Sequence, residues 1–259
     1  MSKTLFGADV FELDVHLTAD NHPVAIHDYT VNRTTDGRGV VRNLTLSELK
    51  KLDAGYRFSP DSGATYPWRN RRIRIPTLAE VLDTFPNDRF NIEIKPAVPG
   101  IERRILHIIN QREMEGRVLL MSPYREVLEK IRRLDPLIPT ASSFSEKSLL
   151  ALLARPNPAP MNVADVPYRL GPVRILGKKL VRLCQNIGIH VHVWTVNDTY
   201  SIQRLLRMGV DGIITDRPDV AWDVFVKMGV RNVERDIAWT RRNRHKNSSL
   251  DIPDPVPIV

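Results

Sequence analysis

The segment "FELDVHLTADNHPVAIHD", residues 11–28, alternates polar and apolar side chains and then enters a second apolar run. Its polar positions include Glu12, Asp14 and His16, each flanked by apolar residues. Because alternate side chains of a β-strand point to opposite faces, the two carboxylates share one face of this strand. The pattern predicts a half-buried strand whose acidic face needs a neutralising partner.

Apolar runs and segments of helical spacing alternate along most of the chain. The strand-like runs are residues 11–17, 23–28, 90–95, 117–121, 139–144, 161–167, 189–196 and 211–216. The helix-like segments are residues 77–85, 101–113, 125–134, 146–154, 176–188 and 199–209. Strands that alternate with helices predict parallel strand pairing, and therefore an α/β fold.

The chain has 259 residues, a length at which (β/α)8 barrels commonly form one domain. A closed TIM barrel is favoured over an open doubly wound sheet because no glycine-rich dinucleotide loop follows any strand. We expect residues 1–245 to form this barrel and residues 246–259 to be a proline-rich tail.

The formal net charge of +8 favours anionic partners in general. Its basic clusters, residues 69–74 and 241–246, are not interleaved with the aromatic or glycine residues of a nucleic-acid-binding module. We therefore interpret them as solvated surface and expect no nucleic-acid partner. The single cysteine, Cys184, fits a reducing compartment, and no apolar run approaches the roughly 20 residues of a membrane span. We expect a cytoplasmic protein without stable membrane insertion, and the oligomeric state stays open.

Three acids fall on predicted central strands, at the end where a barrel carries its chemistry. Glu12 and Asp14 are joined by Glu93, which lies between two isoleucines. Three carboxylates in one barrel mouth would resist ionisation unless a cation neutralised them. Oxygen ligands without cysteine indicate a hard cation, Ca²⁺ or Mg²⁺.

Other polar residues near the predicted strand ends have a structural and a functional interpretation. Lys95 either pairs with Glu93 or holds a phosphoryl oxygen, and both roles can coexist. His27 is either a turn residue or a general acid/base, and Trp194 is either core or the apolar wall of a ligand site. His16 shares the acidic face, whereas His22 is expected to be exposed.

Several sequence blocks, taken together, resemble the glycerophosphodiester phosphodiesterase family in order and spacing. They are "ELDVHLTADNHPVAIHDYTVNRTTDGRG", "LTLSELKKLDAG", "IPTLAEVL", "NIEIK", "VHVWTVND" and "GVDGIITDRPD". The resemblance covers about Phe6 to Asp219. It implies a TIM barrel that cleaves small-molecule glycerophosphodiesters into sn-glycerol 3-phosphate and an alcohol, in glycerophospholipid metabolism.

The resemblance also implies roles for individual residues. Glu12, Asp14 and Glu93 match the family's ligands of one divalent cation, and His27 matches one of its two acid/base histidines. Lys95 matches the lysine that contacts the phosphate, and Trp194 matches an aromatic residue of the substrate pocket. In the implied mechanism a metal polarises the phosphoryl group, a neighbouring glycerol hydroxyl attacks, and two histidines exchange the acid and base roles.

The sequence departs from the family at two places. Family members begin with a His-Arg-Gly strand and a Glu-Asn-Thr stretch, and this sequence contains neither. We therefore expect the first barrel strand, the second histidine and a phosphate-binding arginine to be missing, through a misplaced start, a fragment or degeneration. Such a chain is expected to be poorly stable and nearly inactive. The second departure is "LLMSPY", residues 119–124, where the family more often has a serine and an aromatic.

Two alternatives to this hydrolase remain open. A non-catalytic phosphodiester-binding barrel would keep the metal site and Lys95 but lack turnover. A related phospholipase would act on intact lipids, although the chain has no apolar loop for entering a bilayer.

Overall fold

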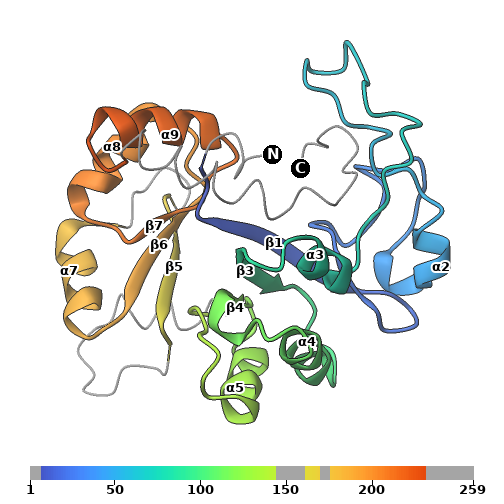
Figure 1. Ribbon diagram of the computed structural model, residues 1–259, viewed down its shortest axis with the longest axis horizontal. Coiled ribbons are helices and arrows are strands. Elements are labelled where there is room, and N and C mark those ends of the chain that lie inside the picture. The colour runs from blue at the N-terminus through green and yellow to red at the C-terminus, as the bar shows by residue number, and fades with distance from the viewer. Residues whose placement is uncertain (1–6, 144–160, 170–175, 232–259) are drawn as a thin grey trace. The chain divides into compact units, whose positions relative to one another are not determined.

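The computed structural model describes residues 7–143, 161–169 and 176–231. The chain divides into two compact units, one of residues 12–144 and one of residues 1–11 and 145–259. Each unit has its own sheet (Figure 1).

The unit of residues 12–144 is built on a four-stranded sheet. Its strands are β1 (Val10–Leu17), β2 (Pro23–Ala25), β3 (Arg89–Ile94) and β4 (Val118–Met121), in the order β2-β1-β3-β4. β3 and β4 are parallel, with Glu93 opposite Met121. Just after β3, the Lys95 amide donates a hydrogen bond to the Val15 carbonyl of β1 at 3.1 Å. Residues that follow β3 are therefore held beside the second half of β1.

β2 corrects the expectation of uniformly parallel strands, because it runs antiparallel to β1. Residues 18–22 form a tight turn in which the Thr18 amide donates to the His22 carbonyl and Asn21 has a φ of +65°. A parallel crossover needs a dozen or more residues, so this turn can only reverse the chain. The strand also ends at Ala25, which leaves His27 and Asp28 in a bend.

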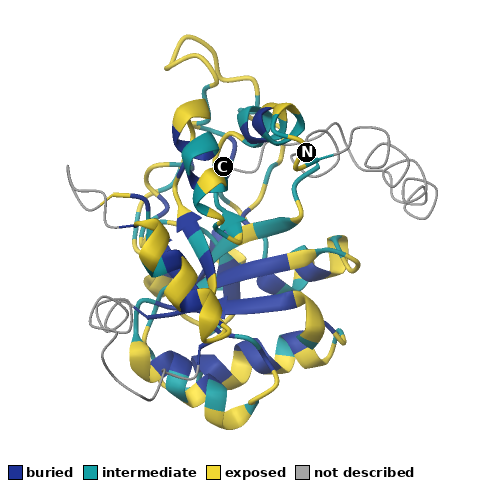
Figure 2. Ribbon diagram, turned by 90° about the vertical axis from the view of Figure 1, so that its left-hand side faces the viewer, coloured by how far each residue is buried: buried dark blue, intermediate teal, exposed yellow. Residues whose placement is uncertain are grey.

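The helices of this unit range from one turn to ten residues, and two of them begin at a side-chain cap. They are the short η1 (Val41–Asn43), η2 (Glu115–Arg117) and α2 (Leu46–Leu49), and the longer α3 (Leu78–Thr84), α4 (Ile101–Asn110) and α5 (Arg125–Leu134). Thr45 with Glu48 and Thr77 with Glu80 form capping boxes at α2 and α3. The longer helices bury one apolar stripe and expose the opposite face (Figure 2).

The second unit contains the parallel strands β5 (Val163–Pro167), β6 (His190–Trp194) and β7 (Gly212–Ile213), in that order. The helices among its described residues are α7 (Lys178–Asn186), α8 (Thr199–Met208) and α9 (Pro218–Lys227). Their buried residues, including Val181, Cys184, Ile202, Leu205 and Val224, form one apolar core with the strand residues Val191 and Val193. The sequence pattern did not predict α9, whose first residue is a proline at a position where a missing amide donor costs nothing.

Some predicted segments cannot be compared with the structure. The helix expected at residues 146–154, the basic cluster at 241–246 and the tail at 246–259 lie outside the described residues. Of the strand expected at 139–144, Thr140 forms a parallel bridge with Leu120 of β4. None of the helices in the described part of the chain combines the length and the apolar composition of a membrane span.

Candidate active site

The three predicted carboxylates lie together in the unit of residues 12–144. Glu12 and Asp14 are on the same face of β1, and Glu93 is the second-to-last residue of the adjacent strand β3. Each offers a carboxylate oxygen, and these oxygens lie within 4.8 Å of one another. Glu12 is exposed, whereas Asp14 and Glu93 are partly buried. We call these three residues the carboxylate cluster.

Lys95 provides the cluster with a cation. Its Nζ lies 2.9 Å from Asp14 Oδ1 and 3.1 Å from Glu93 Oε2. Burial alone would lower the pKa of Lys95, but the contacts with Asp14 and Glu93 outweigh it and raise the pKa above its ordinary value. The lysine is therefore charged at neutral pH, and its ammonium contacts two of the three carboxylates.

His27 follows β2 with its imidazole largely in solvent, at a side-chain exposure of 65%. Its Nδ1 lies 2.8 Å from Asp28 Oδ1. Arg33 holds the same carboxylate from the other side, through Nε to Oδ2 at 2.7 Å and Nη2 to Oδ1 at 3.1 Å. The hydrogen bonds from Arg33, reinforced by His27, lower the pKa of Asp28 to about 2. Asp28 is thus a fixed anion beside the histidine.

His16 is buried and contacts the backbone of His27. The residue is 4% exposed, and its Nε2 donates a hydrogen bond to the His27 carbonyl at 3.1 Å. Burial lowers the pKa of His16, which keeps the ring neutral at pH 7. The ring also packs edge-on against Tyr29 at 4.9 Å. His22 is exposed, as predicted, at a side-chain exposure of 52%.

Two tyrosines near these groups were missed by reasoning from the sequence. Tyr29 is 58% exposed and forms a hydrogen bond with Tyr124, which raises the pKa of Tyr29. The charges of Lys95 and Glu93 also act on Tyr29, so its hydroxyl lies near the carboxylate cluster. The signals were present in the sequence, because Tyr29 is two residues after His27 and Tyr124 follows the fourth strand.

Trp194 belongs to the other unit, where it is the last residue of β6 and is 36% exposed. Its carbonyl accepts a hydrogen bond from the Tyr168 amide at 2.7 Å. An exposed aromatic at a strand end fits a ligand wall as well as a surface position. Its predicted role in substrate binding stays a prediction.

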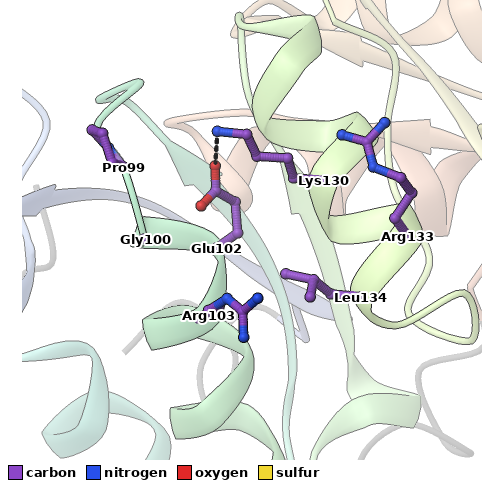
Figure 3. A pocket seen from close by; sticks show the side chains of 7 residues that line it. All are labelled: Pro99, Gly100, Glu102, Arg103, Lys130, Arg133 and Leu134. Atoms are coloured by element: carbon purple, nitrogen blue, oxygen red, sulfur yellow. Dashed lines mark ion pairs between the residues drawn. The ribbon is translucent and has the colours of Figure 1, made fainter.

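A separate groove of about 360 Å³ lies between α4 and α5 (Figure 3). Lys130 Nζ lies 3.2 Å from Glu102 Oε1 across it, and Glu102 is 3% exposed. Arg103 and Arg133 contribute further positive charge to its wall. Its lining, among the described residues, includes none of the six predicted site residues. The Glu102–Lys130 pair links the two helices, and the predicted chemistry belongs to the carboxylate cluster.

The carboxylate cluster fits a hard divalent cation. Two oxygens that are each about 2.4 Å from a Ca²⁺ ion can be at most about 4.8 Å apart, and the three oxygens satisfy this limit. The charge is also suitable, since a bound cation would reduce the repulsion among three neighbouring carboxylates. Water and substrate oxygens would complete the coordination.

Parallel strands flanked by helices, together with a carboxylate cluster that fits a divalent cation, define an α/β protein with a candidate metal site. Comparison with known proteins identifies the family. The model of the Glycerophosphoryl diester phosphodiesterase family matches residues 4–220. A glycerophosphodiester phosphodiesterase of Caldanaerobacter subterraneus subsp. tengcongensis is 36% identical over 229 residues, which cover 86% of this chain and 88% of that protein. One from Bacillus subtilis is 31% identical over 227 residues, 82% of this chain and 75% of that protein.

The chain therefore belongs to the glycerophosphoryl diester phosphodiesterase family, and the predicted enzyme class, a phosphoric diester hydrolase, is confirmed. A phosphodiesterase of Oleispira antarctica, solved in complex with the product sn-glycerol-3-phosphate, has a similar fold. It gives a TM-score of 0.67 at 24% identity and covers 86% of this chain and 87% of that one. This likeness supports the predicted TIM-barrel fold class.

Proposed function

We propose that the carboxylate cluster belongs to the active site of a protein that hydrolyses small-molecule glycerophosphodiesters to sn-glycerol 3-phosphate and an alcohol, with one divalent cation, Ca²⁺ or Mg²⁺, at this cluster. The observation that carries this proposal is the convergence of Glu12, Asp14 and Glu93 beside Lys95. The product named for the Oleispira antarctica structure supports the substrate class.

Glu12, Asp14 and Glu93 would hold the cation, which as a Lewis acid polarises the phosphoryl group. Lys95 would bind a non-bridging phosphoryl oxygen by a charge-assisted hydrogen bond. Its ammonium has three N–H donors, and contacts with Asp14 and Glu93 use two of them. One donor is thus left for the substrate.

His27 would exchange protons with the reacting oxygens. Its Nδ1 is engaged by Asp28, so Nε2 is the nitrogen available for proton transfer. Its exposed ring can meet a substrate without the site having to open. In the overall reaction, one water is consumed as the phosphorus–oxygen bond to the alcohol breaks.

The test is hydrolysis of glycerophosphocholine by the full natural protein, with release of glycerol 3-phosphate as the readout. We expect a chelator to abolish release and Ca²⁺ or Mg²⁺ to restore it. Calorimetry with the same substrate separates the alternatives. Substrate binding without any release of glycerol 3-phosphate would contradict the proposal and favour a non-catalytic binding barrel.

A further inference from the structure

Arg33 lies outside the carboxylate cluster, yet it is two hydrogen bonds from the histidine proposed for proton transfer. The chain of contacts runs from Arg33 to the Asp28 carboxylate and from that carboxylate to His27 Nδ1. All three residues lie in the unit of residues 12–144. We infer that Arg33 is a positioning residue, which fixes the orientation and tautomer of His27 by clamping Asp28. This inference rests on the proposed function of His27.

The geometry of the clamp is that of a fork on a carboxylate. Both Arg33 nitrogens, Nε and Nη2, contact separate Asp28 oxygens, and a planar guanidinium in this arrangement restricts rotation of the carboxylate. Asp28 Oδ1 is then directed at His27 Nδ1 at 2.8 Å. Since a carboxylate only accepts hydrogen bonds, this contact requires a proton on Nδ1. In the neutral ring the lone pair is consequently on Nε2, the nitrogen that must accept a proton.

The backbone that carries this clamp is itself held in place. Val31 and Thr35 flank Arg33 and are fully buried, and the Thr35 amide and hydroxyl both donate to the Val31 carbonyl. The His27 carbonyl accepts the hydrogen bond from His16. Arg33 therefore extends from a fixed turn to a fixed histidine, even though its own side chain is 54% exposed.

A surface ion pair is an alternative explanation of the Arg33–Asp28 contact, since exposed pairs of this kind contribute little stability. The same unit contains a matched pair for comparison, because Arg112 donates hydrogen bonds to Asp83 through Nε and Nη2 at 2.8 Å each. No described histidine contacts Asp83. If the fork mattered only for stability, the two arginines would respond alike to substitution.

The experiment compares Arg33→Lys with Arg112→Lys, because lysine keeps the charge and removes the fork. The readouts are glycerophosphocholine turnover and the ¹⁵N spectrum of labelled histidines, which reports which His27 nitrogen carries the proton. We expect Arg33→Lys to lower kcat about 10-fold or more, with KM and cation affinity changed less than about twofold. The Nδ1–H signal of His27 should weaken in favour of the other tautomer. Arg112→Lys should change neither readout.

Asp28→Asn serves as a second variant in case Arg33→Lys does not fold, and it should reproduce the change of tautomer and the loss of kcat. A wild-type His27 protonated on Nε2, or an unchanged tautomer and kcat in Arg33→Lys, would overturn the inference. The spectrum also separates this inference from the proposed function. If the natural protein released no glycerol 3-phosphate while the tautomer still responded to Arg33→Lys, hydrolysis would be refuted and the positioning role supported.

Discussion

Polar side chains gather on β1 and β3 in one unit and after β6 and β7 in the other, but their partners in the protein differ. After β6 and β7, the Asn197 amide nitrogen donates to Asp216 Oδ2 at 2.9 Å, and Asn197 Oδ1 accepts from the Thr215 hydroxyl and the Asp216 amide. We call Asn197, Thr215 and Asp216 the asparagine network. In this network each donor has an acceptor from the protein itself.

The carboxylate cluster is the opposite case. Its members are acceptors only, and Lys95 is the one ammonium whose contacts with two of them, Asp14 and Glu93, the described residues record. The asparagine network joins two strand ends by hydrogen bonds within the protein, whereas the cluster gathers three anionic side chains whose oxygens can bind a cation. The difference indicates where to look for function: at clustered anionic oxygens that can bind a cation.

Substitution in the cluster should have the largest effect. Asp14→Asn removes one anionic ligand and a partner of Lys95. Turnover of glycerophosphocholine should therefore fall by more than about 100-fold, a larger loss than is usual for a residue that only supports a metal ligand. Asp216→Asn is the matched change in the asparagine network and should leave turnover little changed. Equal losses of turnover in the two variants would contradict the functional difference between the carboxylate cluster and the asparagine network.

The proton-transfer role of His27 gives the next effect. His27→Ala should lower turnover by roughly 100-fold with little change in cation affinity, the scale expected when a general acid or base is lost. His22→Ala is the control, because its exposed ring lies 3.8 Å from Asp20 and contacts no member of the cluster among the described residues. Full activity of His27→Ala would leave this histidine as a turn residue.

Lys95→Met tests whether the cluster is under electrostatic strain. Without the ammonium, the three carboxylates repel one another, so the free energy of unfolding of the metal-free protein should fall by about 2 kcal/mol. Added Ca²⁺ should recover most of that loss, because the cation replaces the missing positive charge. Urea unfolding with and without Ca²⁺ measures both quantities, and a loss that Ca²⁺ cannot relieve would mean that Lys95 acts mainly through packing.

The smallest effect concerns pH and the clamp on Asp28. Because Arg33 and His27 lower the pKa of Asp28 from 3.8 to about 2, the folded state binds this proton more weakly than the unfolded state. The stabilisation is therefore complete above pH 4 and is lost as the pH falls toward 2. The difference between the thermal unfolding midpoints at pH 4 and at pH 2 should be smaller in Asp28→Asn than in the wild type. Identical differences would show that Asp28 is not linked to stability.

Much of the fold could be predicted from the sequence, since the spacing of apolar residues reports directly on strands and helices. The pattern at 125–134 coincides with α5, and the one at 199–209 exceeds α8 only by its capping Gly209. The direction of β2 could not be predicted from the same pattern. An apolar run does not show whether a strand is parallel or antiparallel to its neighbour. The direction of β2 follows from the turn that the Thr18–His22 hydrogen bond closes, because this turn reverses the chain.

The site shows the same division between local and non-local information. Glu12 and Asp14 share a face because they are two residues apart on a strand, and this relation follows directly from the sequence. The clamp of Arg33 on Asp28 depends on the path of the turn between them, which is set by the burial of Val31 and Thr35. Side-chain contacts across such a turn have no sequence period and emerge only from the folded chain.

The most direct test of the central claim is calorimetric titration of the protein with Ca²⁺ and with Mg²⁺. We predict one divalent-cation site in the wild type and in Asp216→Asn, and a strong loss of affinity in Glu12→Gln and Glu93→Gln, because each of these removes an anionic ligand. Undiminished binding in both glutamate variants would contradict the account, since the cation would then be held somewhere other than the carboxylate cluster.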